Sequence, residues 1–198
     1  MSITTYAELK AAVAKWVNKT NLTAQIPDFI RIAEAKLNRR LRVSSMETAL
    51  VETAITSGAV ARPAGMLSIK AIWSTGAEQV TLQQSTLEYI NRQPTNAGQA
   101  RWFAWSEDDL VFYPTGGSVA AIYYTSIPAL SDAAETNWLL SASPDLYLWA
   151  AIEQAHVYLH NAEAEALFRA RTDALIEELN GRNTANQFGG GPLVARAR

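Results

Sequence analysis

The stretch from Pro144 to His160 constrains the fold of this chain more than any other. Ser143 is a favourable N-cap residue, Pro144 suits the first helical position, and Asp145 suits the positive end of a helix dipole. Apolar residues then lie on nearly every side of the predicted helix, among them Leu146, Trp149, Ile152 and Leu159. A surface helix has one apolar stripe, so this helix must be covered by its own chain or by neighbouring copies. The sequence therefore predicts that it is the hub of a helical bundle.

The composition limits the classes of function. The chain has 198 residues, of which 48% are hydrophobic, enough for one domain with a core or one domain with an insertion. Its net charge of −2 gives no bulk attraction to nucleic acid or to an anionic membrane. The absence of cysteine excludes disulfides, thiolate zinc sites and thiol catalysis. Because no signal peptide or long apolar run is seen, we expect a soluble protein that is made in a cytosol.

Both ends of the chain are predicted to be helical. Thr5 and Glu8 form a capping box before a first helix, and helical spacing predicts others over about 23–41 and 162–179. Asn180-Gly181 is expected to end the last helix. The remainder, 182–198, contains three consecutive glycines, one proline and no acidic residue, so it is predicted to be a flexible arm.

The middle of the chain has a different pattern. From Ser44 the apolar residues alternate with period two, and turn residues separate several short predicted strands, including a hairpin over 101–113. The stretch 127–141 has few regular signals and is expected to be a connector. The predicted fold class is therefore α+β, a mainly helical bundle of about four helices with an inserted small antiparallel β region. We expect the bundle to comprise 1–43 and 131–181, the β-rich insertion 44–130, and the C-terminal docking arm 182–198.

Three groups of polar residues contain the residue types of metal, catalytic or phosphate-binding sites. Glu153, His156 and His160 share one helix face at metal-ligand spacing, but a polar strip between helices is the better interpretation, since the order is not His-Glu-x-x-His. Glu107, Asp108 and Asp109 are adjacent carboxylates that turn chemistry explains. Arg31, Lys36, Arg39, Arg40 and Arg42 could contact phosphate, although cations near the negative end of a helix are more often solvated. We therefore predict no catalytic residues, no metal site, no cofactor and no enzymatic activity.

The hairpin carries the aromatic residues Trp102, Phe103, Trp105, Phe112 and Tyr113. They could stack on sugars or bases, but on a hairpin such residues more often form a small core. Two alternatives follow from this region. One is a carbohydrate- or nucleic-acid-binding module that uses the aromatic hairpin. The other, less favoured, is a cell-wall hydrolase that uses carboxylates.

Three stretches carry a resemblance to a known family. The first runs from Ala24-Gln-Ile-Pro-Asp-Phe-Ile30 through Ala33-Glu-Ala-Lys-Leu-Asn-Arg-Arg-Leu41. The second is Ile127-Pro-Ala-Leu-Ser-Asp132 with Thr136-Asn-Trp-Leu-Leu140 and Pro144-Asp-Leu-Tyr147, and the third is Gly190-Gly-Pro-Leu193. Their order and spacing over essentially the whole chain resemble the head-to-tail adaptor proteins of tailed bacteriophages, the connectors that bind the portal and complete the head.

The resemblance implies a structural protein of the virion neck, at the head-tail junction, that is synthesised in the bacterial host cytoplasm. Adaptors of this kind form a ring, usually dodecameric, beneath the portal protein ring, extend the DNA channel and contact tail or nozzle proteins. DNA would pass without sequence recognition, and no membrane is involved. A near-neutral charge and six tryptophans agree with a channel protein whose function lies in its interfaces. The expected subunit-interface residues are Leu146, Trp149, Ile152 and Leu159. The expected portal-docking residues are Arg182, Phe188, Gly190, Gly191, Pro192, Leu193, Val194, Arg196 and Arg198.

Overall fold

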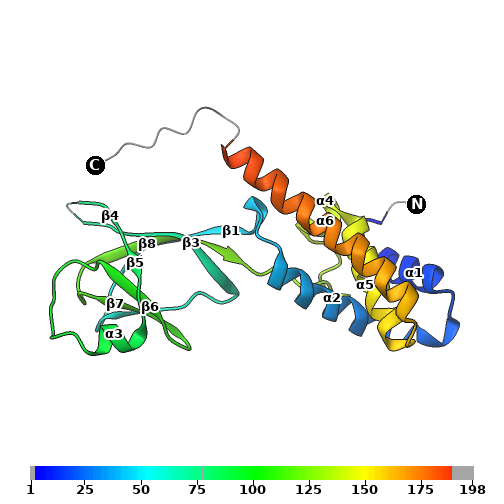
Figure 1. Ribbon diagram of the computed structural model, residues 1–198, viewed down its shortest axis with the longest axis horizontal. Helices are drawn as coiled ribbons and strands as arrows, with labels where there is room; N and C mark the ends of the chain where they lie inside the picture. Colours follow the sequence, from blue (N-terminus) through cyan, green and yellow to red (C-terminus); the bar gives the residue numbers. More distant parts are fainter. Residues whose placement is uncertain (1–2, 77, 189–198) are drawn as a thin grey trace. The chain divides into compact units, whose positions relative to one another are not determined.

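A computed structural model describes residues 3–76 and 78–188 of the protein. The chain divides into two compact units, each considered by itself below. The helical unit consists of 1–45 and 127–198, and the β unit consists of 46–126. Helices and mainly antiparallel sheets therefore occur in one chain (Figure 1), which confirms the predicted α+β class.

The helical unit contains more helices than the sequence predicted. Its α-helices are α1 (Tyr6–Val17), α2 (Ile26–Arg40), α4 (Trp138–Ala142), α5 (Pro144–Tyr158) and α6 (Ala162–Phe188). With α3 of the β unit, the described residues form six α-helices, so the expected bundle of about four is not confirmed. The extra helix α4 lies in the predicted connector. Its N-cap Asn137 accepts a hydrogen bond from the Leu140 N–H at 2.8 Å, but five residues are too few to show helical periodicity.

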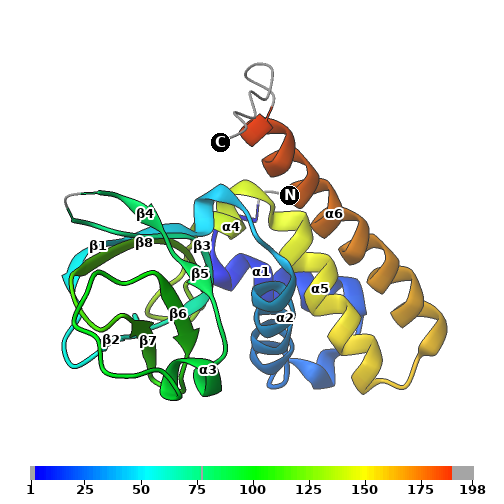
Figure 2. The ribbon, with the colours of Figure 1, turned by 60° about the vertical axis from the view of Figure 1, so that its left-hand side comes forward.

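Helix α5 is the hub of this unit, as predicted. It packs against α1, α2, α4 and α6, and Figure 2 shows it lying between α2 and α6. Leu146, Tyr147 and Ile152 are fully buried. The polar atoms of Tyr147 are satisfied within the core, because its hydroxyl accepts from Asn137 Nδ2 at 2.7 Å and donates to Glu34 at 3.2 Å. A helix that is apolar on most sides is thus covered largely by its own chain.

The last helix does not end at Asn180-Gly181, which corrects both the predicted stop and the predicted start of the arm. Helix α6 continues to Phe188. The Asn180 side chain is engaged elsewhere, since it accepts from the Arg42 N–H at 3.0 Å and donates to the Arg40 carbonyl at 3.1 Å. Asn183, one turn later, accepts from the Ser44 N–H at 2.9 Å and donates to the Arg42 carbonyl at 3.2 Å. These tertiary hydrogen bonds favour continuation of the helix over the local stop signal.

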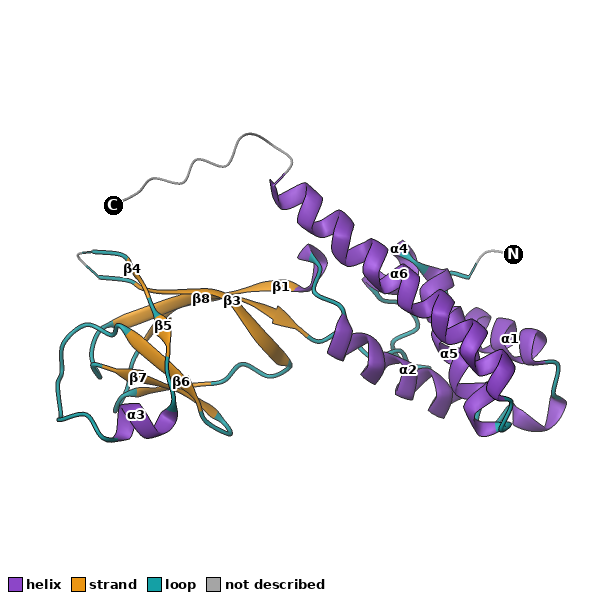
Figure 3. Ribbon diagram, in the orientation of Figure 1, coloured by secondary structure: helices purple, strands orange, loops and turns teal. Residues whose placement is uncertain are grey.

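The β unit contains two four-stranded sheets (Figure 3), with the orders β1-β8-β3-β4 and β2-β7-β6-β5. Its elements are β1 (Glu47–Ala54), β2 (Ala59–Ala61), β3 (Met66–Ser74), β4 (Val80–Thr81), β5 (Gln83–Gln84), α3 (Leu87–Asn91), β6 (Trp102–Trp105), β7 (Asp109–Tyr113) and β8 (Ser118–Thr125). The pairing of β5 with β6 is parallel, unlike the antiparallel expectation. It arises because the chain passes from one sheet to the other at Leu82, whose N–H donates to the Ile72 carbonyl.

The hydrophobic core of the β unit includes Val60, Leu110, Phe112 and Val119. The predicted hairpin is present, with Phe103 of β6 opposite Phe112 of β7. Both of these phenylalanines are buried, which leaves the tryptophans and Tyr113 of the hairpin nearer the surface.

Candidate interaction surface

Four aromatic rings from three helices of the helical unit form a continuous column. Trp16 of α1 meets Trp149 of α5 edge to face, with ring centroids 4.9 Å apart. Trp149 stacks on Phe168 of α6 at 5.7 Å, and Phe168 stacks on His156 of α5 at 5.4 Å with nearly parallel rings. We call these four residues the aromatic column. Pairs with this geometry add to the stabilisation that burial supplies, so the column holds α1, α5 and α6 together.

The aromatic column is partly open to solvent. Trp16 is 52% exposed and Trp149 is partly exposed, while Leu167, one turn before Arg171 on α6, is 51% exposed. The Arg171 guanidinium lies over the rings of Trp149 and Phe168, at 5.3 and 5.5 Å from their centroids. Exposed aromatic side chains beside an arginine are typical of the centres of protein–protein interfaces. We call Trp16, Trp149, Leu167 and Arg171 the column surface, and it is the candidate interaction surface of this unit.

Sequence reasoning identified only Trp149 of the column surface. Trp16 shares the helical spacing of the apolar residues Leu9 and Val13, which favours a position on the apolar face of the first helix. One signal was available, because Trp16 and Val17 are adjacent and adjacent helical residues point about 100° apart. Val17 is buried, and Trp16 consequently lies at the edge of the helix contact.

The subunit-interface prediction needs a correction. Leu146 and Ile152 are each 0% exposed, because α5 is enclosed by the other helices of its own unit. They belong to the core and cannot contact another subunit. Trp149 and Leu159 are partly exposed and stay candidates.

A network of ion pairs joins α2, α5 and α6. Lys36 Nζ lies 2.8 Å from Glu153 Oε2 and 3.2 Å from Asp173 Oδ1. Arg40 also pairs with Asp173, and Arg169 Nε lies 3.7 Å from Glu153 Oε1. Only 4% of the Glu153 side chain is exposed. These charges stabilise contacts between helices within the subunit.

Glu153, His156 and His160 have separate environments in the structure. Glu153 pairs with Lys36, and His156 packs flat on Phe168. His156 Nδ1 is buried without a hydrogen-bond partner, and burial lowers the pKa of this imidazole. His160 is exposed just after α5, with a left-handed φ of 52°. Within 3–76 and 78–188, no group of three or more His, Cys, Asp or Glu residues could hold a metal ion.

The basic residues of α2 are not gathered into one patch. Lys36 and Arg40 take part in the ion-pair network, and Arg31 pairs with Asp28 at 3.0 Å. Arg42 donates to the carbonyls of Asn38 and Leu41 near the C-terminal end of α2, where a cation interacts favourably with the helix dipole. Arg39 is exposed.

The aromatic hairpin of the β unit divides its residues between two environments. Phe103 and Phe112 are core residues, and Trp105 packs against that core. Trp102 stacks on Tyr113 with centroids 6.0 Å apart and meets Tyr89 of α3 at 6.3 Å. Of the adjacent carboxylates, Glu107 and Asp108 are exposed in the turn between β6 and β7, and Asp109 is the first residue of β7.

The predicted docking arm falls largely outside the described residues. Arg182 is in α6 and exposed, and Phe188 is the last residue of α6. Gly190, Gly191, Pro192, Leu193, Val194, Arg196 and Arg198 lie beyond the part that the structure describes. Among the described residues, no helix is both long enough and apolar enough to cross a membrane.

Comparison with known proteins gave one family. The model of the family described as SU10 adaptor protein matches residues 4–196, nearly the whole chain. No curated protein matches the sequence. The family match spans both units and includes every residue of the column surface.

Proposed function

We propose, from the premise that this chain belongs to the SU10 adaptor protein family, that it forms a ring beneath the portal of a tailed bacteriophage. In this proposal the ring, dodecameric in the virion, extends the DNA channel and connects the portal to tail or nozzle proteins. The family match over residues 4–196 is the observation that carries the proposal, since it identifies a bacteriophage adaptor, a structural protein of the virion.

The column surface supports a lateral contact between subunits. A ring contact is heterologous, so one surface of each subunit must meet a different surface of the next. The column surface offers one such patch, in which half-exposed Trp16 meets Trp149 and the Arg171 guanidinium lies over the Trp149 ring. Trp149 is partly exposed, and aromatic and arginine side chains are the residues that most often dominate binding energy.

The charge of the chain fits passage of DNA. A net charge of −2 gives DNA no strong attraction to the wall of a channel, so DNA can slide past without being held. Conversely, the predicted arm has arginine at 182, 196 and 198 and no acidic residue. We propose that this arm docks on the portal, each copy weakly and the ring durably through multivalency.

Assembly on portal rings tests the lateral contact. Trp16→Asp places a charge on a residue that is 52% exposed. The subunit should still fold, because Trp149 and Phe168 keep their contact between α5 and α6, while ring formation on purified portal is lost. The matched control is Val51→Asp in the β unit, at a residue that is 75% exposed, and it should assemble normally. Electron micrographs and sedimentation of the portal complex give the readout. Complete rings with Trp16→Asp would show that the column surface is not the lateral contact.

Deletion of 189–198 tests the arm. The cut is placed after Phe188, because a cut after Asn180 would also remove Asn183 and its hydrogen bonds to the backbone of Ser44 and Arg42. Helical content should be unchanged and portal attachment greatly weakened. Attachment at full strength without 189–198 would rule out the docking role.

One observation favours a second candidate, a binding module for carbohydrate or nucleic acid. Trp102 and Tyr113 stack beside Tyr89, which is 43% exposed, and Trp102 lines a shallow depression with Gln83 and Arg101. Aromatic rings with one free face can stack on sugars or bases. A change in tryptophan fluorescence on titration with oligosaccharides or oligonucleotides, lost in Trp102→Ala, would support this module.

A further inference from the structure

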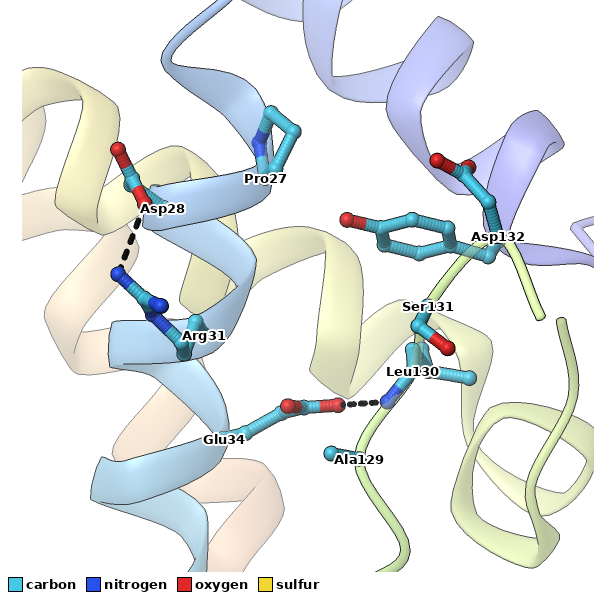
Figure 4. A pocket seen from close by; sticks show the side chains of 9 residues that line it. Pro27, Asp28, Arg31, Glu34, Ala129, Leu130, Ser131 and Asp132 are labelled. Atoms are coloured by element: carbon cyan, nitrogen blue, oxygen red, sulfur yellow. Dashed lines mark hydrogen bonds and ion pairs between the residues drawn. The ribbon is translucent and has the colours of Figure 1, made fainter. Parts of the chain in front are cut away.

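A second feature of the helical unit is a pocket of about 260 Å³ that the proposed function does not use. One wall is α2, with Pro27, Asp28, Arg31 and Glu34, and the opposite wall is the segment 129–132 (Figure 4). Tyr6 of α1 also lines it. All of these residues belong to the helical unit, so the pocket lies within one compact body.

Glu34 is a buried acid that lines this pocket. The residue is only 6% exposed. Its Oε1 accepts two hydrogen bonds, from the Leu130 N–H at 2.8 Å and from the Tyr147 hydroxyl at 3.2 Å. Its Oε2 makes no hydrogen bond within the described residues. Oε2 therefore keeps some exposure to solvent, because in that part of the chain the fully buried side-chain atoms without a partner are Gln25 Oε1 and His156 Nδ1. One carboxylate oxygen is therefore held by the fold and the other is open to the pocket.

Glu34 lacks the cation that each neighbouring acid has. Asp28 pairs with Arg31 at 3.0 Å, and Asp132 pairs with Lys10 at 2.6 Å. For Glu34, the structure shows no ion pair in the described part of the chain, and burial raises the pKa of its carboxyl group. A buried carboxylate is normally paired, because removing an isolated charge from water is costly. The pocket thus has on its wall a buried carboxyl group without a cation, and space in front of it.

We infer that this pocket receives an arginine side chain from a partner protein, with the guanidinium bound to Glu34 Oε2. Charge complementarity selects a cation. A guanidinium suits a partly desolvated site better than an ammonium group, because it is more weakly hydrated and carries five N–H donors in a planar array. It can bond Oε2 and still donate to other acceptors on the wall, such as Ser131.

The rim of the pocket favours the same ligand. Asp28 and Asp132 have side chains that are 62% and 86% exposed, and both line the opening. Their own cations satisfy them only in part, since exposed ion pairs are weak and exchange readily. They would attract an approaching arginine before it reaches Glu34. This inference stands independently of ring formation and of the column surface.

The test uses N-acetyl-arginine amide as the probe and the full-length protein. The backbone amide signal of Leu130 in ¹⁵N-labelled protein should shift saturably, because this N–H donates to the same carboxylate that the probe binds. Glu34→Gln keeps an oxygen that can accept from Leu130 and Tyr147 but removes the charge. It should weaken binding by about tenfold or more, as loss of a charge-assisted hydrogen bond predicts. Glu177→Gln, at an exposed position of α6, is the matched control and should bind normally.

Two further measurements keep the inference falsifiable if Glu34→Gln folds poorly. N-acetyl-citrulline amide, which has a similar shape without the charge, should give no shift. The carboxyl carbon signal of Glu34 should titrate at lower pH when the arginine probe is present, because a bound cation stabilises the carboxylate. Equal binding of both probes, an unchanged titration, or no shift at the solubility limit of the arginine probe would overturn the proposal.

Discussion

Glu153 Oε2 on α5 lies 2.8 Å from Lys36 Nζ on α2, and only 4% of the Glu153 side chain is exposed. This pair crosses the interface between two helices that are distant in sequence. Asp173 of α6 lies 3.2 Å from the same Lys36 nitrogen, so one cation connects three helices. The hub helix is therefore held both by apolar contacts and by a buried ionic contact whose orientation is fixed.

Removing Lys36 should destabilise the helical unit. Lys36→Met leaves Glu153 buried with only Arg169, at 3.7 Å, as its cation. We expect the free energy of unfolding to fall by about 3 kcal/mol, because the buried Glu153 carboxylate loses its nearest cation and the exposed Arg169 compensates it only in part. Urea denaturation followed by circular dichroism measures it. Arg31→Met breaks the exposed pair with Asp28 and should change stability by about 0.5 kcal/mol or less. Similar effects of the two variants would contradict this role for the buried pair.

Gly181→Ala should stabilise the protein. Gly181 lies inside α6, and a Cβ atom added there would meet nothing within 4 Å. Alanine restricts the unfolded chain more than glycine does, so the free energy of unfolding should rise by about 0.5–1 kcal/mol. Gly65→Ala is a contrasting control, because Gly65 has φ +73° and its Cβ would lie 2.8 Å from Ser126 Oγ. If Gly181→Ala were destabilising, the helix would end at Asn180 after all.

Asn183→Ala should loosen the segment that follows α2. Asn183 is 7% exposed, and its side chain bonds the Ser44 N–H and the Arg42 carbonyl. Truncation leaves these backbone groups without that partner, so we expect a loss of about 1–3 kcal/mol. Hydrogen exchange at Ser44 should also become faster. Thr184→Ala, next along α6, removes only a hydroxyl bonded to its own helix and should cost about 0.5 kcal/mol or less. Unchanged exchange at Ser44 would be the contrary result.

His156 should make stability depend on pH. Burial lowers the pKa of His156 in the folded protein, so as pH falls below about 6.5 the unfolded chain takes up a proton first. The contribution of neutral His156 to the free energy of unfolding is therefore complete above that pH, and it is lost as the pH falls toward the folded-state pKa. His156→Phe retains an aromatic ring beside Phe168 and removes the titration. The free energy of unfolding of His156→Phe, measured with denaturant, should therefore increase relative to that of the wild type as the pH falls from 7 to 5.

His160→Asn is the control for this comparison. Asparagine tolerates the left-handed backbone at that position, where φ is 52°. The variant retains His156, so it should retain the wild-type dependence on pH. A constant difference in stability between His156→Phe and the wild type across this range would exclude His156 as the source.

Local signals in the sequence predicted the regular elements well. The capping box of Thr5 and Glu8 is present, with the Thr5 hydroxyl accepting from the Glu8 N–H. Ser143 and Pro144 mark the start of the hub helix, and the hairpin of β6 and β7 lies where alternation predicted it. These features depend on neighbours in sequence, so a single sequence is enough to reveal them.

Tertiary contacts account for the features that the sequence did not predict. Asn180 and Asn183 bond to the chain after α2, and this outweighs the stop signal of Asn180-Gly181. Ile152 looked available for a partner because its helix is apolar all round, but five helices of one unit suffice to bury it. No local pattern pointed to Glu34, because the hydrogen bond that buries and orients its carboxyl group comes from the backbone N–H of Leu130, 96 residues away.

The pairing of β1 with β8 has a consequence for how such proteins can diversify. Glu47 lies opposite Tyr124 in this ladder, so the β unit begins and ends at neighbouring points. An insert whose ends meet can be exchanged for another, or for a short turn, without stretching the host. The helical unit therefore needs only a short connection between residues 45 and 127. A chain with residues 46–126 replaced by a tight glycine-rich linker should still fold its helices.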